Sequence, residues 1–462
     1  MSETFPTPSP ADWRALAEKA LKDRPLESLV HLDADGLAVR PLYAAATGVE
    51  PLFAPRPSEA EGRAWDLRAT IEGDSPAVVN AEVLTELEGG AASVVLRGAI
   101  LKDSEPLAQA LEGVALELAA VALDAGLEGP DAANALAVAA KGSPRAKLLF
   151  HMDPVSAFAA SGAAPRSMEE HLMLAANTAA RHAGAYPDAR FFLASGRVAH
   201  EAGGSIGQEL AFAAANAVAL IKAAVGAGMS VEQALRGTVL GVAVDQEYFD
   251  GLAKVRALRL MWRSISRAFG VGVPAVIEAR SSRRMLAARD PWPNLLRLTA
   301  AGFAGAVGGA DAVVLEGFTR AEGTPDAFAR RQARNTQLVL MEEASLGRVD
   351  DPAAGSWYLD QRTRELAEAG WEEFRIIEAE GGILDALRGG LIQPRIGRAR
   401  QAREHALAAG TVHLVGVTKF VDPEPRSTHT DVEVETVTAG GGDVCEPLTP
   451  IRWAADFEAG EA

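Results

Sequence analysis

The sequence predicts an α/β protein: a (β/α)8 TIM barrel with an extended N-terminal arm and a helical C-terminal extension. Eight short apolar runs, each flanked by Gly, Pro or Asp, alternate with longer Ala- and Leu-rich stretches. The runs are nearly continuous in apolar residues, which is typical of parallel strands covered on both faces. The 462 residues, 48% of them hydrophobic, suffice for a barrel and a second layer. Eight successive strand–helix units favour this fold.

The predicted strands and helices divide the chain into four segments. Residues 1–57 form an N-terminal helix and extended arm, 58–320 the barrel, 321–420 a helical extension of the barrel domain, and 421–462 a C-terminal tail. The tail is Gly- and Pro-rich and is expected to be exposed and to clasp another surface.

The N-terminal arm is expected to begin with a charged amphipathic helix from Ser9 to about Lys22. Residues 25–57 are punctuated by Pro and contain the turn signal Asp33-Ala-Asp-Gly36, so they are predicted to be extended. The arm has no core of its own, and its aromatic residues must therefore lie on this barrel or on a partner subunit. These residues are Trp13, Tyr43 and Phe53.

The strands are placed on the short apolar runs because each run is too short for a helix. The predicted strands are Trp65–Glu72, Ser93–Arg97, Gly113–Leu118, Ala146–Asp153, Ala189–Gly196, Thr238–Asp245, Ala275–Ser282 and Ala312–Phe318. Beyond them, Ala327–Met341 and Asp360–Ile377 are predicted helices, and Thr411–Thr418 is predicted to be one last strand.

Composition excludes several classes of partner. A net charge of −17 argues against a nucleic acid or an anionic membrane. The single cysteine, Cys445, excludes an intrachain disulfide and a Cys-based zinc site. The start of the chain lacks the features of a signal peptide, and no apolar run approaches ~18 uncharged residues. We therefore expect a cytoplasmic protein with no membrane or nucleic-acid partner.

Chemistry in a parallel barrel sits at the carboxyl ends of the strands. His151 and Asp153 end the fourth predicted strand, and His200 and Glu201 follow the fifth. Together they could form a metal or acid–base cluster, as in a metal-dependent barrel hydrolase. No third strand end carries a His, so hydrogen-bonded structural residues are the alternative interpretation.

Basic residues gather at the end of the seventh predicted strand, in Arg280-Ser-Ser-Arg-Arg284. Barrels often bind phosphate near strands seven and eight, so Arg280, Arg283 and Arg284 are candidate substrate-binding residues. Ion pairing with acidic neighbours is the alternative. The glycines of Gly270-Val-Gly-Val-Pro-Ala275 precede a strand rather than follow one, so they predict a turn and not a dinucleotide site.

Several motifs, in order along the chain, resemble the adenosylcobalamin-dependent acyl-CoA mutases, and above all the methylmalonyl-CoA mutase family. They are Ser195-Gly196 with Glu201-Ala-Gly203, Ala253-Lys-Val-Arg-Ala-Leu-Arg-Leu-Met-Trp262, Asp290-Pro-Trp-Pro-Asn294, Gly308-Gly309, Ala333-Arg-Asn-Thr-Gln-Leu-Val-Leu-Met-Glu-Glu343 and Leu346-Gly-Arg-Val-Asp-Asp-Pro-Ala-Ala-Gly-Ser-Trp-Tyr358. The resemblance extends from about Trp13 to Pro450.

The departures from the family pattern fall on its catalytic positions. The resemblance places Arg197 and Val198 where catalytic chains carry Tyr-His, and Thr70 where they carry a Tyr over the radical site. The Arg that pairs with the substrate carboxylate falls near Ser161. Valine can neither donate a hydrogen bond nor move a proton. The resemblance thus implies a chain with no catalytic residues.

The family's cobalamin module carries Asp-x-His-x-x-Gly, whose His is the lower cobalt ligand and is held by the carboxylate. The His-x-x-Gly matches here, His200–Gly203 and His413–Gly416, are preceded by Val198 and Thr411. The resemblance therefore implies a small, non-catalytic subunit that binds no cofactor. Its partner in a heterodimer would be the catalytic large subunit, which carries adenosylcobalamin and interconverts methylmalonyl-CoA and succinyl-CoA. A substrate-binding barrel served by a separate cobalamin subunit is the enzymatic alternative, and a metal-dependent barrel enzyme is the other.

Overall fold

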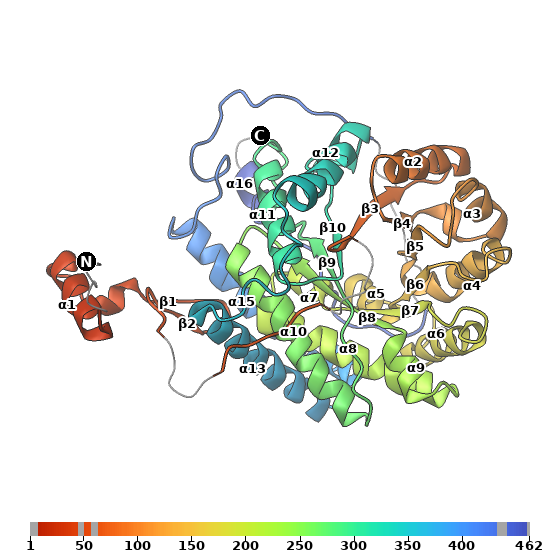
Figure 1. Ribbon diagram of the computed structural model, residues 1–462, viewed down its shortest axis with the longest axis horizontal. Coiled ribbons are helices and arrows are strands. Elements are labelled where there is room, and N and C mark those ends of the chain that lie inside the picture. Colours follow the sequence, from red (N-terminus) through yellow and green to blue (C-terminus); the bar gives the residue numbers. More distant parts are fainter. Residues whose placement is uncertain (1–7, 45–49, 57–62, 432–440, 460–462) are drawn as a thin grey trace, which may run out of the picture.

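A closed barrel of eight parallel strands forms the centre of the molecule (Figure 1). The computed structural model describes residues 8–44, 50–56, 63–431 and 441–459. The barrel order is β10-β3-β4-β5-β6-β7-β8-β9, which confirms the predicted fold. The barrel strands are β3 Asp66–Glu72, β4 Ser93–Arg97, β5 Ala120–Leu123, β6 Leu148–Met152, β7 Arg190–Ser195, β8 Thr238–Val244, β9 Ile277–Ser281 and β10 Ala312–Val314.

The third barrel strand lies further along the chain than the sequence predicts. Residues 113–118, predicted to be a strand, form turns, in which Leu118 N donates to Ala115 O at 2.9 Å. Gly113 adopts a positive φ of 79°, and the Leu118 side chain is 77% exposed. An exposed leucine at that position cannot belong to a strand covered on both faces. The apolar residues that follow, Ala120–Leu123, form the buried strand.

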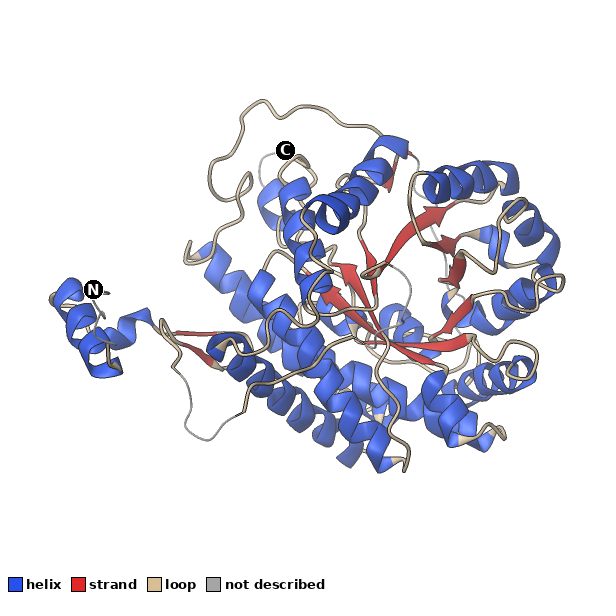
Figure 2. Cartoon of the chain, viewed as in Figure 1, coloured by secondary structure: helices blue, strands red, loops and turns tan. Residues whose placement is uncertain are grey.

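Helices surround the strands on the outside of the barrel (Figure 2). They are α2 Pro76–Glu88, α3 Ser104–Ala110, α4 Gly129–Ala139, α5 Pro154–Ser161, α6 Met168–His182, α7 Arg197–Glu201, α8 Ile206–Gly226, α9 Val231–Arg236, α10 Tyr248–Ala268, α11 Asn294–Val307 and α12 Ala327–Leu338. By length and composition α8 alone among the described residues could cross a membrane, but 72% of its apolar window is buried. It packs against α13, α6 and β7 as a core helix.

The C-terminal extension is helical, with one local error in the prediction. It contains α12, given above, α13 Trp357–Ala379, α14 Ile383–Arg388 and α15 Ile392–Ala408, and the tail contains α16 Ala455–Ala459. The predicted strand Thr411–Thr418 is wrong: Thr418 Oγ1 accepts from Leu414 N at 2.8 Å and closes a turn there. The described part of the tail after 440 is not simply exposed. Leu448 and Trp453 are buried, and Cys445 N donates to Gly162 O, so the tail clasps its own barrel.

The N-terminal helix lies apart from the rest of the molecule (Figure 1). Ser9 and Asp12 form a capping box that begins α1 Pro10–Leu21, and none of its residues is buried. A short hairpin of β1 His31–Leu32 and β2 Ala38–Val39 follows. The extended part of the arm then binds the body, since Ala54 N donates to Asp351 Oδ2 at 2.7 Å and Leu52 N to Asp360 Oδ2 at 2.9 Å.

Arg256 of α10 anchors that part of the arm. Its side chain is fully buried and pairs with Asp351 and Asp360, each at 3.0 Å. It also donates to Leu52 O at 2.6 Å and to Thr363 Oγ1 at 3.0 Å. One guanidinium thus joins the arm, the loop before α13 and α13 itself.

We expect Arg256→Ala to lower the free energy of unfolding by about 3 to 5 kcal/mol, because it leaves two buried carboxylates without a positively charged partner. Urea unfolding of the full chain measures this change. Arg375→Ala is the matched control, since Arg375 and Glu372 form an exposed pair on α13; it should change stability by less than about 0.5 kcal/mol. Equal effects of the two substitutions would contradict the anchoring role.

Candidate functional site

The interior of the barrel at the carboxyl ends of its strands is filled by charged side chains. Seven of them form an alternating chain of ion pairs, which we call the interior ion-pair chain. Its contacts are Arg68–Glu278 at 2.5 Å, Glu278–Arg280 at 3.0 Å, Arg280–Asp124 at 3.1 Å, Asp124–Arg97 at 2.8 Å, Arg97–Glu316 at 3.6 Å and Glu316–Arg283 at 3.1 Å.

The contact between Arg280 and Asp124 crosses the barrel. Arg280 belongs to β9, and Asp124 directly follows β5. In the closed order these two strands are four positions apart in either direction. Their side chains can therefore meet only through the interior, and the ion-pair chain occupies the space along the barrel axis.

The carboxylates of this chain are held ionised. Burial by itself would raise the pKa of Glu278, but Arg280 and Arg68 outweigh it and hold the pKa well below its usual range. The pKa of Asp124 is lowered in the same way, with Arg97 and Arg280 outweighing burial. These groups are too acidic to exchange protons near neutral pH.

His151 lies against this chain as a neutral side chain. It belongs to β6, where the register with β7 shifts, and its backbone is left-handed with φ 47°. Its Nδ1 lies 4.0 Å from Glu278 Oε2, and neither ring nitrogen has a hydrogen-bond partner among the described residues. Burial lowers the His151 pKa to about 4 despite the attraction of Glu278.

The other members of the predicted metal cluster belong to separate networks. Asp153 caps α5 through Ser156 N at 3.0 Å and accepts from Asn216 Nδ2 at 2.8 Å. Glu201 accepts from the backbone N–H groups of Arg283 and Arg284. Within the described ranges, no three His, Cys, Asp or Glu side chains are placed to hold a metal ion.

His200 is enclosed by polar partners on both sides of its ring. Its Nδ1 lies 3.2 Å from Glu209, its Nε2 lies 2.9 Å from Ser282 Oγ, and the side chain is 1% exposed. Glu209 in turn pairs with Lys254 at 2.6 Å. Burial, followed by the charge of Arg284, lowers the His200 pKa. The geometry makes His200 part of the packing between α7, α8 and α10.

The four positions where the family pattern is lost lie in different surroundings. Arg197 and Val198 open α7, directly after β7; Val198 packs in the core, and Arg197 has no ion-pair partner among the described side chains. Thr70 shares a face of β3 with Arg68 and Glu72. Ser161 lies at the end of α5, where its Oγ donates to Ala157 O at 2.9 Å and Ala163 O at 2.7 Å.

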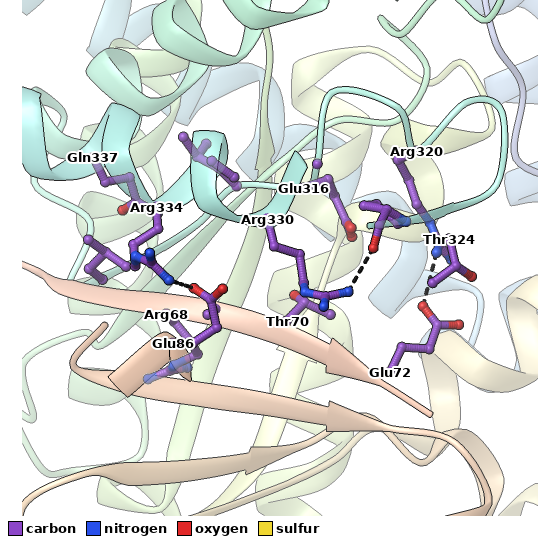
Figure 3. A pocket seen from close by; sticks show the side chains of 16 residues that line it. Arg68, Thr70, Glu72, Glu86, Glu316, Arg320, Thr324, Arg330, Arg334 and Gln337 are labelled. Atoms are coloured by element: carbon purple, nitrogen blue, oxygen red, sulfur yellow. Dashed lines mark hydrogen bonds and ion pairs between the residues drawn. The ribbon is translucent and has the colours of Figure 1, made fainter. Parts of the chain in front are cut away.

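Thr70 faces a pocket between β3, the loop after β10 and α12 (Figure 3). Its hydroxyl is buried and has no hydrogen-bond partner in the part of the chain that the structure describes. The arginines around it are engaged: Arg320 pairs with Glu72 at 2.9 Å and Arg334 with Glu86 at 2.7 Å (Figure 3). The pocket is thus walled by completed ion pairs, and the unpaired hydroxyl is a small polar group among them.

The three candidate arginines at the end of β9 and just after it differ in the groups that they contact. Arg280 and Arg283 join the interior ion-pair chain, as described above. Arg284 instead donates to His200 O at 2.8 Å and Gly204 O at 3.0 Å, and its guanidinium lies over the Trp453 ring at 5.5 Å. Arg284 therefore fastens the C-terminal tail to the barrel and does not face the interior site.

The sequence interpretation missed the partners of Arg280 and Arg283. Arg97, Asp124, Glu278 and Glu316 were not predicted as site residues. A signal was present, because Glu278 and Arg280 are charged residues two positions apart in an otherwise apolar strand, and such residues share one face of the strand.

These features define a class of protein, a (β/α)8 barrel whose interior is closed by ion pairs and lacks a metal-ligand cluster among the described residues. The chain belongs to the methylmalonyl-CoA mutase family, whose profile, described as "Methylmalonyl-CoA mutase", matches residues 88–441.

Three relatives illustrate the similarity. The "Methylmalonyl-CoA mutase small subunit" of Streptomyces virginiae is 37% identical, over 95% of this chain and 74% of the relative. The protein of the same name from Propionibacterium freudenreichii subsp. shermanii is 31% identical, over 92% and 70%. The "Methylmalonyl-CoA mutase" of Cereibacter sphaeroides is 29% identical, over 88% and 64%.

We expect His151→Asn to remove part of the acid sensitivity of the fold. The folded-state pKa of His151 is about 4, below the unfolded value of about 6.5, so only the unfolded chain gains a proton as pH falls between these values. The free energy of unfolding of the wild type, taken relative to that of His151→Asn, should therefore fall by about 3 kcal/mol from pH 7 to pH 4.

Urea unfolding at several pH values measures this difference. Asparagine is chosen because it tolerates a positive φ. Exposed His31 supplies the control variant, His31→Asn, which should keep the wild-type pH dependence. Parallel pH curves for His151→Asn and the wild type would show that His151 is not buried as a neutral group.

Proposed function

We propose that this chain is the small, non-catalytic subunit of a heterodimeric, adenosylcobalamin-dependent methylmalonyl-CoA mutase. Its role is to bind and stabilise the catalytic large subunit, which interconverts methylmalonyl-CoA and succinyl-CoA. The observation that carries the proposal is the interior ion-pair chain, because it fills the space that a substrate would need. We place the complex in the cytoplasm, in keeping with the absence of a possible disulfide in a chain with one cysteine.

The pattern of identity among relatives supports the subunit assignment. Relatives named small subunit, from Streptomyces, Mycobacterium and Propionibacterium, are 31 to 37% identical to this chain. Relatives named only methylmalonyl-CoA mutase, from Cereibacter, Rhizobium and Escherichia coli, are 26 to 29% identical. The chain is thus more similar to the former group than to the latter.

The side chains in the barrel support a non-catalytic role. Val198 is an apolar core residue where proton transfer or hydrogen bonding would be needed. The carboxylates of the interior are locked between arginines, with pKa values well below their usual range. Acid–base catalysis near neutral pH requires groups that titrate near that pH, and these do not.

The residues present do not fit a cobalamin ligand. His200 is 1% exposed and enclosed by Glu209 and Ser282, so a cobalt ion has no access to its ring. His413 is exposed but has Thr411 in place of the carboxylate that would hold it. We therefore place adenosylcobalamin in the partner subunit.

Helix α1 is the part of this chain best suited to contact the large subunit. Trp13, Leu16 and Ala17, followed one turn later by Ala20 and Leu21, form an apolar stripe at helical spacing. No residue of α1 is buried, and the Leu16 side chain is 68% exposed. A capped helix with an unburied apolar stripe, held away from its own barrel, fits a surface groove of another subunit.

Co-expression with a catalytic large subunit tests the proposed function. We expect the two chains to purify as a stable complex in which isomerisation of methylmalonyl-CoA depends on the large subunit and on adenosylcobalamin. This chain alone, supplied with adenosylcobalamin and substrate, should form no succinyl-CoA. Turnover by this chain with only a separate cobalamin-binding chain would overturn the proposal in favour of a substrate-binding barrel.

We expect Trp13→Ala combined with Leu16→Ala to weaken association with the large subunit at least tenfold. Each large apolar side chain buried in an interface contributes about 1.5 to 3 kcal/mol, and about 1.4 kcal/mol corresponds to tenfold. Titration calorimetry of the two purified subunits measures the change. Arg14→Ala with Glu18→Ala, on the polar face of the same helix, should leave affinity within about threefold.

The melting temperature of the isolated small subunit should not change with either pair of substitutions, because no α1 residue is buried in it. Unaltered affinity of the Trp13 and Leu16 variant would exclude α1 from the interface.

A further inference from the structure

Arg197 lies at the mouth of the barrel without a partner for its charge. It is partly buried and lies two residues after the end of β7, at the first position of α7. Its Nε is shielded from solvent, and no described residue accepts a hydrogen bond from its guanidinium or pairs with it. The charges that act on it are those of Arg280, Glu201, Arg283 and Arg97. A partly buried cation beside three other cations and one carboxylate that is engaged elsewhere favours the binding of an anion.

The acidic groups around Arg197 are already engaged. Glu278 is shared by Arg68 and Arg280, Asp124 by Arg280 and Arg97, and Glu316 by Arg97 and Arg283, as the contacts of the interior ion-pair chain show.

Glu201, the remaining acidic neighbour, is held elsewhere. Its Oε2 accepts from Arg284 N at 3.0 Å, and both of its oxygens accept from Arg283 N at 3.1 Å. Asp66 pairs with Arg68, the first arginine of the chain, at 2.6 Å. The four arginines of the chain are thus matched by four carboxylates, and Arg197 adds a charge that pairs with none of them.

Unused donors also occur on the neighbouring arginines. The Nε atoms of Arg280 and Arg283, like that of Arg197, are shielded from solvent and have no hydrogen-bond partner within the described ranges. Buried donors of this kind are costly unless a partner is present. Arg280 belongs to the seventh strand of the barrel and Arg283 follows it, which is the region where barrels hold phosphate groups.

We propose that a phosphate-type oxyanion binds between Arg197, Arg280 and Arg283 at the carboxyl-terminal mouth of this barrel. Guanidinium groups recognise such anions through charge-assisted hydrogen bonds from a fixed planar fork. Donors from the separate segments after β7 and after β9 suit a tetrahedral anion, which accepts from several directions, better than a planar carboxylate. This proposal does not depend on the proposed function, because the arginines come from this chain whether or not it pairs with a large subunit.

The charge of Arg197 is costly to the free protein. Burial, reinforced by the charge of Arg280, lowers the Arg197 pKa to about 10. Removing this charge should therefore not destabilise the anion-free fold, and a bound anion should stabilise the wild type.

Calorimetric titration of the full chain with inorganic phosphate, at constant ionic strength in a buffer free of other oxyanions, tests the site. We expect saturable binding to one site, and at least tenfold weaker binding by Arg197→Gln, which corresponds to the loss of one charge-assisted contact. Arg236→Gln is the control, because Arg236 forms an exposed pair with Glu232 on α9; it should bind phosphate as the wild type does.

Thermal unfolding without phosphate provides the second measurement. The melting temperature of Arg197→Gln without phosphate should equal or exceed that of the wild type, and phosphate should raise the melting temperatures of the wild type and Arg236→Gln more than that of Arg197→Gln. Glycerol 2-phosphate in place of inorganic phosphate distinguishes the sources: equal or tighter binding identifies the anion as the phosphate group of a larger molecule, and weaker binding identifies the free ion.

Three results would overturn the proposal. They are the lack of saturation up to about 10 mM phosphate, equal affinity of Arg197→Gln and the wild type, and tighter binding of succinate than of either phosphate.

Discussion

The contact between Arg280 and Asp124 joins opposite walls of the barrel, and the arrangement of its interior depends on it. Asp124 also pairs with Arg97, and Arg280 also pairs with Glu278. This contact therefore links the part of the interior ion-pair chain that contains Glu278 to the part that contains Arg97. An apolar barrel core is filled by layers of branched side chains from alternate strands. Here the same space is filled by long charged side chains that reach across the axis and depend on one another for their charge partners.

The energetics of this arrangement explain why it closes the barrel without making it reactive. Taking an ion pair out of water costs several kcal/mol per ion, and the attraction offsets this cost only when the geometry is good and the remaining hydrogen bonds are made. Sharing each carboxylate between two arginines supplies the attraction, whereas the Nε donors of Arg280 and Arg283 have no partner among the described residues. The sharing also fixes the protonation states, because the carboxylates stay ionised far below neutral pH. Groups locked in this way provide shape and stability but cannot take up or release a proton during a reaction.

The sequence predicted most of the fold and only part of the site, for a physical reason. Apolar runs between chain breakers are local signals, and seven of the eight predicted strands overlap the observed ones. The third failed because two apolar runs, Gly113–Leu118 and Ala120–Leu123, lie next to each other, and only burial distinguishes them. The site depends on pairs that are distant in sequence, such as Arg68 with Glu278. The prediction therefore identified Arg280 and Arg283 but not their partners, and it could not separate Arg284 from them.

The outer surface of the molecule differs from its interior in one respect that bears on assembly. Within the described part of the chain, the barrel helices each bury apolar residues, whereas α1 buries none and leaves Leu16 68% exposed. The hairpin that follows α1 is nevertheless fixed to the body, because Arg362 pairs with Asp33 and Gly207 N donates to Asp35 Oδ1 at 3.1 Å. The capping box at Ser9 stabilises the first turn of α1. A helix that is already formed and tethered at its base loses less conformational freedom when a partner binds it. The contacts of Asp33 and Asp35 therefore lower the entropic cost of joining the second subunit.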